Sequence, residues 1–334
     1  MGSRPRRSPS PIREREFHRW LARHLPAGRA GLLPLGDDAA AIRPPRGSVA
    51  VLTTDSLVEG THFLRGSPPR RIGAAAVGVS LSDLAAKGAR PAAVLLALIV
   101  PPGTPSAWAR GLVDGAEAFA EEFGASVLGG DTKPGPVRAV VSTALGWGEP
   151  HRLAARTGAR AGDRLVMTGV VGRGGLAAAR LGDRRRPRIE ALSALLDVRP
   201  RVREGLALAR WAHAMLDTSD GLAESSHLLS DASRLRVVVE ESHLPLAPGI
   251  LRRVRSLPRR RTVAFFGGDY ELLAALDPLD VEKARRAVRS AGGILTEVGR
   301  IEPGRGAWLE GAKGIVPMPR AAWRPFETDG CALL

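Results

Sequence analysis

The first half of the chain alternates between segments with a helical period of apolar positions and shorter apolar runs. Three segments carry apolar side chains three and four positions apart, which predicts helices: residues 17–25, 72–87 and 106–123. The third follows Thr104-Pro105 and ends before Gly124, which are helix start and stop signals. Four shorter runs predict strands: residues 49–54, 92–100, 126–128 and 137–147.

A change in composition separates this pattern from a second one. Residues 148–162 are enriched in Arg, Gly and Pro, and we place a domain boundary there. Further along, we expect strands at 164–168, 214–217, 235–240 and 263–266, helices at 202–212 and 281–291, and a Gly-rich helix start at 172–175. This order predicts a two-domain α+β / α/β chain: a disordered basic arm at 1–15, an N-terminal α+β domain at 16–150 and a C-terminal α/β domain at 151–334.

The chain is strongly basic, with 49 Lys and Arg against 34 Asp and Glu and a formal net charge of +15 in 334 residues. Such a charge suits nucleic acid, whose phosphates attract cations. The arginines are, however, spread over many predicted helix faces, and no nucleic-acid recognition module is visible in the sequence. We therefore expect a solvated basic surface and no nucleic-acid partner.

The cysteine content and the apolar runs indicate where the protein resides. Cys331 is the only cysteine, so the chain forms no internal disulfide and suits a reducing compartment. The most apolar run, residues 92–100, is too short to span a bilayer, and the basic start lacks the apolar core of a secretion signal. We expect a cytoplasmic protein that does not enter a membrane.

Six short clusters rich in Gly and Asp carry most of the functional information. In chain order they are Gly36-Asp37-Asp38, Thr53-Thr54-Asp55, Ser82-Asp83, Gly129-Gly130-Asp131-Thr132, Asp217-Thr218-Ser219-Asp220-Gly221 and Gly267-Gly268-Asp269-Tyr270-Glu271. Carboxylates gathered in one site repel each other unless a cation lies between them. Mg²⁺ suits this arrangement, because it takes oxygen ligands and shares them with water and substrate phosphates.

The common phosphate-binding signatures are missing from the sequence. It has no G-x-x-x-x-G-K-[ST] loop, no G-x-G-x-x-G after a strand and no kinase catalytic loop. Phosphate would then be held by metal bridges and by backbone N–H groups at glycines. Each cluster alone is more typical of a turn than of a ligand site, so the inference depends on all of them together.

In this order and spacing, the blocks closely resemble those of the thiamine-monophosphate kinase family over residues 15–275. The resemblance places the chain in a superfamily with aminoimidazole ribonucleotide synthetase, selenophosphate synthetase and the hydrogenase-maturation dehydratase. It implies an N-terminal domain that dimerises through its sheet, with ATP and several Mg²⁺ ions in the cleft between the domains. The implied activity is direct in-line transfer of a phosphoryl group from ATP to thiamine monophosphate, without a catalytic side chain.

The resemblance also assigns roles to individual residues. The implied Mg²⁺ ligands are Asp38, Thr53, Thr54, Asp55, Asp83, Asp131, Asp217 and Asp220. The implied nucleotide contacts are Gly130, Asp131, Arg156 and Ser219, and the implied acceptor contacts are His62, Asp269 and Phe326. Asp55, Asp83 and Asp131 are expected to reach one site from a strand end, a helix and a turn, and to share metals. Asp37 is expected to orient its turn.

The chain departs from the family pattern on the acceptor side. The last block reads Gly-Glu-Asp-Tyr-Glu in the family, whereas this chain has Gly268 at the first Glu position. The family's aromatic-His-Phe end is replaced by Trp323-Arg324-Pro325-Phe326-Glu327, in which either aromatic ring can still stack on a cationic ring. Three alternatives stay open: a kinase with another phosphorylated acceptor, an ATP-dependent ligase or dehydratase of the same fold, and a non-enzymatic nucleotide- or nucleic-acid-binding protein.

Overall fold

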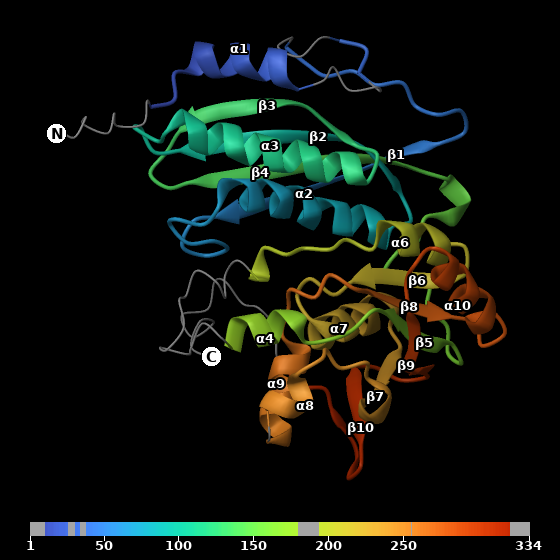
Figure 1. The fold of residues 1–334 in the computed structure, drawn as a ribbon. Coiled ribbons are helices and arrows are strands. Elements are labelled where there is room, and N and C mark those ends of the chain that lie inside the picture. Colours follow the sequence, from blue (N-terminus) through green and yellow to red (C-terminus); the bar gives the residue numbers. More distant parts are fainter. Residues whose placement is uncertain (1–10, 26–30, 34–37, 180–193, 255, 321–334) are drawn as a thin grey trace.

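The computed structural model describes residues 11–25, 31–33, 38–179, 194–254 and 256–320. Two separate mixed sheets define two domains that stack on each other, with helix α2 (Pro69–Ala86) between them (Figure 1). The predicted two-domain fold of mixed helices and strands is therefore confirmed. The exact boundary within residues 148–162 stays a prediction, and residues 1–10 of the expected arm lie outside the described residues.

The N-terminal sheet has four strands in the order β1-β4-β2-β3. Their bounds are β1 Val49–Val58, β2 Arg90–Val100, β3 Ser126–Pro134 and β4 Ala139–Gly148. Only the β2–β3 pair is parallel. Helix α2 and helix α3 (Ser106–Glu122) pack on each other along one face of this sheet (Figure 1). Helix α1 (Glu14–His24) is attached to α3 through the Arg110 guanidinium, which lies over the Trp20 ring.

The two faces of this sheet are chemically different. Side chains alternate between the faces along a strand, and on β1 the even positions are open to solvent while Leu57 is buried. The exposed face carries large apolar side chains at Leu52, Leu95 and Ile99, and Leu52 alone is 64% exposed. We call the face toward α2 the inner face and this exposed face the outer face.

The C-terminal sheet has seven strands in the order β11-β10-β7-β9-β5-β8-β6. Its strands are β5 Arg164–Thr168, β6 Ala212–Asp217, β7 Arg236–Glu240, β8 Leu272–Leu276, β9 Leu295–Glu302, β10 Ala307–Gly311 and β11 Gly314–Pro317. Its helices are α4 Arg173–Ala179, α6 Val202–Leu208, α7 Leu222–Ser233, α8 Ile250–Arg253, α9 Leu257–Phe265 and α10 Val281–Ser290, with 3₁₀ turns at Pro150–Arg152 and Glu241–His243. All neighbouring strands except β7 and β10 run antiparallel.

Close packing of small residues joins the domains along α2. A Cβ added at Gly205 in α6 would lie 2.2 Å from the carbonyl oxygen of Ala85, so the two backbones touch directly. The buried Ala-rich face of α2 belongs to one hydrophobic core with Met215 and Leu272 of the C-terminal sheet. The domains therefore form a single packed body. None of the helices in the described part of the chain has the length and apolarity needed to cross a membrane.

Two local predictions were wrong. Residues 263–266 were expected to be a strand, but they end helix α9, which Ser256 caps by accepting a hydrogen bond from the Arg259 N–H and which has Pro at its first turn. Asp131 was expected in a turn, but β3 runs from Ser126 through Pro134 because it pairs along its length with β2. In both cases, contacts outside the apolar run decided the local structure.

A buried carboxylate in the N-terminal domain should make stability depend on pH. Glu117 on α3 is 7% exposed, and its Oε2 accepts the Val127 N–H at 2.7 Å. Burial raises the pKa of Glu117, with the Val127 N–H opposing the shift and Glu121 adding to it. A carboxyl group with a raised folded-state pKa stabilises the fold while it is protonated, and this contribution is lost as the pH rises through that pKa.

We therefore expect Glu117→Gln to gain stability relative to the parent protein as the pH rises from about 5 to about 8. The amide oxygen of Gln still accepts the Val127 N–H, whereas the charge that burial disfavours is gone. Urea unfolding of both proteins at several pH values measures this difference. A difference in unfolding free energy that stays constant with pH would contradict the prediction.

Candidate active site

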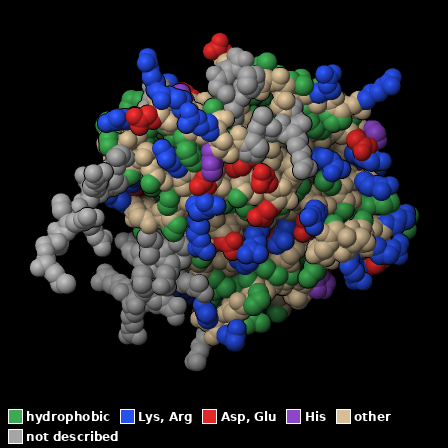
Figure 2. Space-filling view, turned by 45° about the horizontal axis from the view of Figure 1, so that its top comes forward, with side chains coloured by type: hydrophobic (Ala, Val, Ile, Leu, Met, Phe, Trp, Pro, Cys, Tyr) green, Lys and Arg blue, Asp and Glu red, His purple; other side chains and the backbone are tan. Residues whose placement is uncertain are grey.

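A cleft of about 370 Å³ opens between the two domains. Strand β1, the loop that follows it and α2 form one wall, and the C-terminal domain supplies residues 195–198, the β6–α7 loop and residues 266–270. The sequence clusters therefore meet in this cleft. Asp217 lies at the end of β6. Asp55 was expected at a strand end but lies within β1, which continues to Val58 because it pairs with β4 along its whole length. Figure 2 shows acidic side chains gathered in the middle of one face, with many Lys and Arg around them.

Four carboxylates from both domains line this inter-domain cleft, and we call them the cleft carboxylates: Asp55, Asp83, Asp217 and Asp220. Asp55 lies on the inner face of β1, and Asp83 lies on α2, where its Oδ2 accepts the Thr53 hydroxyl at 2.5 Å. Burial and, after it, the neighbouring charges of Asp83, Asp217 and Asp220 together raise the pKa of Asp55 to about 7. The shift shows that this partly buried site brings several carboxylates close together.

The β6–α7 loop holds its carboxylates with short hydrogen bonds. Asp217 is 6% exposed at the end of β6, and its two carboxylate oxygens accept the Ser82 hydroxyl at 2.7 Å and the Ser219 hydroxyl at 2.9 Å. The Ser82 contact crosses from α2 to the C-terminal domain, so it also fixes the domains at the cleft. Burial raises the pKa of both Asp217 and Asp220.

Two basic groups border the acidic cluster. Arg156, in the segment between the domains, lines the cleft, and its charge lowers the pKa of Asp220 against the effect of burial. Lys87, at the end of α2, donates to the carbonyl oxygens of Ala154 and Met215, both at 3.1 Å. Burial lowers the pKa of Lys87 to about 8. Arg156 is placed to meet an anion, whereas Lys87 fastens the two domains to each other.

The donor set fits Mg²⁺. The cleft carboxylates are hard oxygen donors, and the raised pKa of Asp55 reflects burial and neighbouring negative charge, both of which a bound divalent cation would offset. Among the described residues, no group of three His, Cys, Asp or Glu side chains already converges as a metal-binding cluster. Such an open arrangement suits Mg²⁺, which keeps several waters and is bound by few carboxylates together with substrate phosphates.

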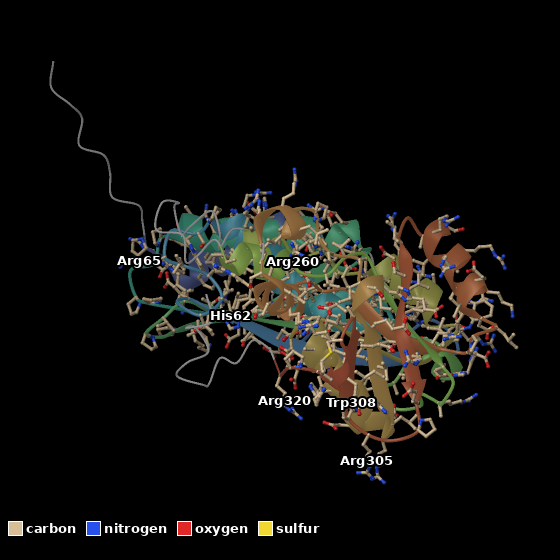
Figure 3. All side chains as sticks on the ribbon, turned by 90° about the horizontal axis from the view of Figure 1, so that it is seen from below. His62, Arg65, Arg260, Arg305, Trp308 and Arg320 are labelled. Carbon is tan, nitrogen blue, oxygen red and sulfur yellow. The ribbon has the colours of Figure 1, made fainter. Side chains whose placement is uncertain are left out.

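His62 lies in the loop that follows β1, where it is labelled in Figure 3, and it lines the same cleft. Its Nδ1 accepts the Val58 N–H at 3.1 Å. Burial lowers the pKa of His62, with the Val58 contact opposing the shift, so the ring is neutral at pH 7. A neutral imidazole beside the cleft provides a polar contact and not a charge.

Asp131 and Thr54 lie away from this group, contrary to the expected sharing of metals. Asp131 pairs with Ala97 on the outer face of the sheet, whereas Asp55 pairs with Ser142, which is fully buried on the inner face. Thr54 also faces outward, and its hydroxyl bonds to that of Thr143 at 3.1 Å. Three strand spacings, roughly 14 Å, separate β1 from β3. Strand parity therefore divides the predicted ligands between two faces.

A second cavity, of about 480 Å³, is lined by two of the expected metal ligands that the first cavity lacks, Asp38 and Asp131. It is bordered by α1 and β3, and its polar lining includes Asp38, Gly130, Asp131 and Thr143. Asp131 is bound by its neighbours, since its Oδ1 accepts from the Thr132 N–H and from Lys133 Nζ, both at 2.8 Å. We call this cavity the outer pocket.

Asp269 was expected to contact the acceptor, but the structure gives its side chain another task. The carboxylate is 1% exposed and accepts the N–H groups of Gly172 at 2.6 Å and Gly174 at 2.9 Å, at the start of α4. Because Asp269 lies within an acidic motif, the sequence suggested a ligand contact and not this hydrogen bonding to backbone N–H groups. Asp37 and Phe326, two other expected site residues, lie outside the described residues.

Sequence reasoning missed the apolar wall of the cleft and the residue next to Asp269. Leu195, Leu196 and Val198 line the cleft, but apolar residues in a sequence are indistinguishable from core. Tyr270 also lines it, with a backbone φ of +54°. Its position inside the last acidic block was the one sequence feature that could have indicated a place in the cleft.

Comparison with known proteins adds independent observations. Models of AIR synthase related proteins match the chain twice, the N-terminal domain at residues 36–148 and the C-terminal domain at residues 160–309. The curated thiamine-monophosphate kinase of Halobacterium salinarum is 40% identical over 268 residues, which cover 80% of this chain and 87% of that protein.

Solved structures of thiamine-monophosphate kinases are also similar to this chain. The thiamine-monophosphate kinase of Stenotrophomonas maltophilia K279a matches with a TM-score of 0.77 and 31% identity, over 85% of this chain and 92% of that one. The protein AaThiL, in its complex with AMPPCP and TMP, matches with a TM-score of 0.71 and 25% identity, over 86% and 90% of the two chains.

Proposed function

The chain belongs to the thiamine-monophosphate kinase family, and from this premise we propose that it transfers the terminal phosphoryl group of ATP to thiamine monophosphate. The products are thiamine diphosphate and ADP. The observation that carries the proposal is the meeting of the cleft carboxylates with Arg156 and Ser219 in one cleft between two domains. A structural relative bound to AMPPCP and TMP supports ATP as donor and a phosphate ester as acceptor.

We propose that the cleft carboxylates hold Mg²⁺ together with the phosphates. Bound there, Mg²⁺ supplies the positive charge that lets two anionic groups approach each other. Thr53 keeps the Asp83 carboxylate in place, and Ser82 and Ser219 do the same for Asp217. Asp83 and Asp217 thus each have an oriented oxygen before substrate binds, which lowers the reorganisation needed in the transition state.

The remaining cleft residues position the two substrates. Arg156 and Ser219 line the cleft beside the acidic cluster, where a guanidinium and a hydroxyl can donate to phosphate oxygens. Leu195, Leu196 and Val198 offer an apolar surface to an acceptor ring and limit the entry of water. The acceptor phosphate is largely ionised at neutral pH, so its oxygen attacks without a general base.

A product assay tests this function. Purified protein is incubated with Mg-ATP and a panel of phosphorylated vitamins and intermediates, including thiamine monophosphate, and diphosphate products are identified by mass spectrometry. We expect thiamine diphosphate to accumulate above a no-enzyme control and to disappear when EDTA replaces Mg²⁺. Release of inorganic phosphate without any diphosphate product would favour the ligase or dehydratase alternative.

The panel also tests the choice of acceptor at Gly268. This residue lines the cleft with a φ of +89°, and a Cβ there would lie 3.5 Å from Gly174 Cα and 3.8 Å from Leu195 Cδ2. At the position that carries an acid in the family pattern, an added Cβ would therefore make ordinary van der Waals contacts with Gly174 and the apolar wall. A diphosphate product from another panel member, formed faster than thiamine diphosphate, would replace thiamine monophosphate as the acceptor.

We also propose that the protein is a homodimer built on the outer face of the N-terminal sheet. Exposed Leu52, Leu95 and Ile99 on this face form an apolar surface that a second copy would bury. Asp131 shares this face, so a second copy would also lie against the outer pocket.

Sedimentation at micromolar concentration should therefore show a dimer, and Leu52→Asp should convert it to a monomer that keeps its secondary structure. A charge placed on this surface opposes burial, whereas the monomer fold tolerates it because Leu52 is already 64% exposed. A parent protein that sediments only as a monomer at this concentration would contradict the proposal.

A further inference from the structure

An ion pair between partly buried Arg201 and fully buried Glu271 lies outside the cleft lining. Glu271, at the start of β8, is fully buried, and it accepts two hydrogen bonds of 2.6 Å from the Arg201 guanidinium. The same carboxylate accepts the Thr168 hydroxyl at 2.9 Å. Gly169 leaves the space for it, since a Cβ at that position would lie 2.2 Å from Glu271 Oε1. The local backbone is thus shaped around this one carboxylate.

The backbone of Glu271 is hydrogen-bonded to the β6–α7 loop. The Thr218 N–H donates to the Glu271 carbonyl oxygen at 2.8 Å, and the Glu271 N–H donates to the Thr218 hydroxyl at 3.0 Å. Thr218 lies between Asp217 and Ser219, whose side chains face the cleft. Any shift of Glu271 would therefore move the loop that carries these two groups.

Tyr270 precedes Glu271 and depends on the same anchor. Its φ of +54° is in the left-handed region, which a bulky side chain adopts only where surrounding contacts enforce it. Asp269 fixes one side of Tyr270 through the N–H groups of Gly172 and Gly174, and Glu271 fixes the other. The Tyr270 ring is thereby held in the cleft wall.

Arg201 connects Glu271 to the apolar segment of the cleft lining. It follows the apolar segment that includes Leu196 and Val198, and it directly precedes helix α6. Its pairing with Glu271 therefore ties this segment to the β6–α7 loop and to Tyr270. The pair joins parts of the chain that are distant in sequence but that all face the same ligand.

We propose that Arg201 and Glu271 form a positioning pair that sets the placement of Tyr270 and the apolar segment against the acceptor. This proposal rests on the proposed kinase function, because the acceptor is the ligand that those walls would enclose. Neither residue touches the reacting atoms. The pair acts by holding three surfaces in register, and a small displacement of such surfaces is enough to slow a reaction about a hundredfold.

The test replaces Arg201 with Lys, which keeps the charge but lacks the planar fork that binds a carboxylate through two parallel bonds. A second variant, Glu271→Gln, keeps the shape and removes the charge. The matched control is Arg261→Lys, since Arg261 binds Glu241 through the same two-bond geometry, at 2.7 and 2.6 Å, on α9 and outside the cleft lining. All variants are compared by thermal unfolding, so that loss of fold is recognised.

Tyr270 provides a direct readout, because it is the only tyrosine in the chain. Protein labelled with 3-fluorotyrosine gives one ¹⁹F resonance from the cleft wall. We expect Arg201→Lys and Glu271→Gln to shift or broaden this resonance, and to lower kcat/KM for thiamine monophosphate about tenfold to a hundredfold. Arg261→Lys should leave both the resonance and kcat/KM unchanged.

The outcomes separate the two proposals. A folded Arg201→Lys protein with the parent's resonance, or with the parent's kcat/KM, overturns the positioning role. Equal losses in Arg201→Lys and Arg261→Lys also overturn it, because they would reflect general destabilisation. A parent protein that makes no thiamine diphosphate overturns the kinase function instead, and the resonance of the variants still reports whether the pair positions Tyr270.

Discussion

Replacing Asp55 with Asn is expected to lower turnover at least about a hundredfold while the protein stays folded. Asn nearly preserves the shape of Asp55 but removes one of the cleft carboxylates that would hold Mg²⁺ against the phosphates. The loss should fall on kcat and on the Mg²⁺ concentration needed for half-maximal activity. Steady-state kinetics over a range of Mg²⁺ measures both, and Asp83→Asn should behave in the same way.

The same substitution should have the opposite effect on stability when Mg²⁺ is removed. The folded-state pKa of Asp55, about 7, lies above the ordinary aspartate value of 3.8, so ionised Asp55 is disfavoured in the fold. Stability of the metal-free protein then falls as the pH rises toward 7 and above. Asn carries no charge, and Asp55→Asn should gain about 1–2 kcal/mol over the parent near pH 8 in EDTA, after allowance for screening.

Asp231→Asn is the matched control, because Asp231 is exposed on α7 and outside the cleft lining. It should change neither turnover nor metal-free stability. If Asp55→Asn and Asp83→Asn were both folded and kept near-normal turnover at limiting Mg²⁺, metal binding by the cleft carboxylates would be wrong.

Gly221→Ala should damage both the fold and the activity. Gly221 begins helix α7 with a φ of +100°, and a Cβ there would lie 2.0 Å from the Phe265 carbonyl oxygen. The position of a Cβ is fixed by its own backbone, and the oxygen it meets is also a backbone atom, so no side-chain rotation relieves the contact. We expect a loss of about 3 kcal/mol or more in the free energy of unfolding, from the strained φ and the overpacking together.

Activity should fall with it, because the displaced segments are those that carry the site. Gly221 directly follows Asp220, and the segment it touches continues to Gly267 and Gly268 in the cleft wall. Gly162→Ala separates the two causes, since Gly162 has a similar φ of +99° but nothing within 4 Å of its added Cβ. Urea unfolding should show a clearly smaller loss for Gly162→Ala, and equal losses would mean that the close contact is unimportant.

Much of the site was accessible from the sequence because its chemistry is local. Asp217 and Ser219 lie two residues apart, and their hydrogen bond of 2.9 Å belongs to the same short loop. The strand that ends at Asp217 could be read from its apolar run, because a carboxylate at a strand end is a pattern within one segment. The strand of Asp55 was also read, but it continues beyond Asp55 to Val58. The acidic blocks also indicated Mg²⁺ and phosphate from composition alone.

The placement of Asp269 shows where local reading fails. Its neighbours in the motif suggested a ligand contact, but its carboxylate binds backbone N–H groups almost a hundred residues away in sequence, at Gly172 and Gly174. Glu271 likewise found its partner at Arg201. Such pairings join residues that are far apart in sequence and depend on the tertiary fold, so the periodicity of a single segment does not predict them.

The sequence by itself determined the kind of chemistry: which residues can bind Mg²⁺ and phosphate, and the family to which their order belongs. Only the tertiary structure decided which of them meet. Asp55 and Asp131 look equivalent in the sequence, yet strand pairing turns Asp55 to the inner face and Asp131 to the outer one. The reason is physical, because side chains alternate strictly along a strand and the face they reach is set by register with distant partners.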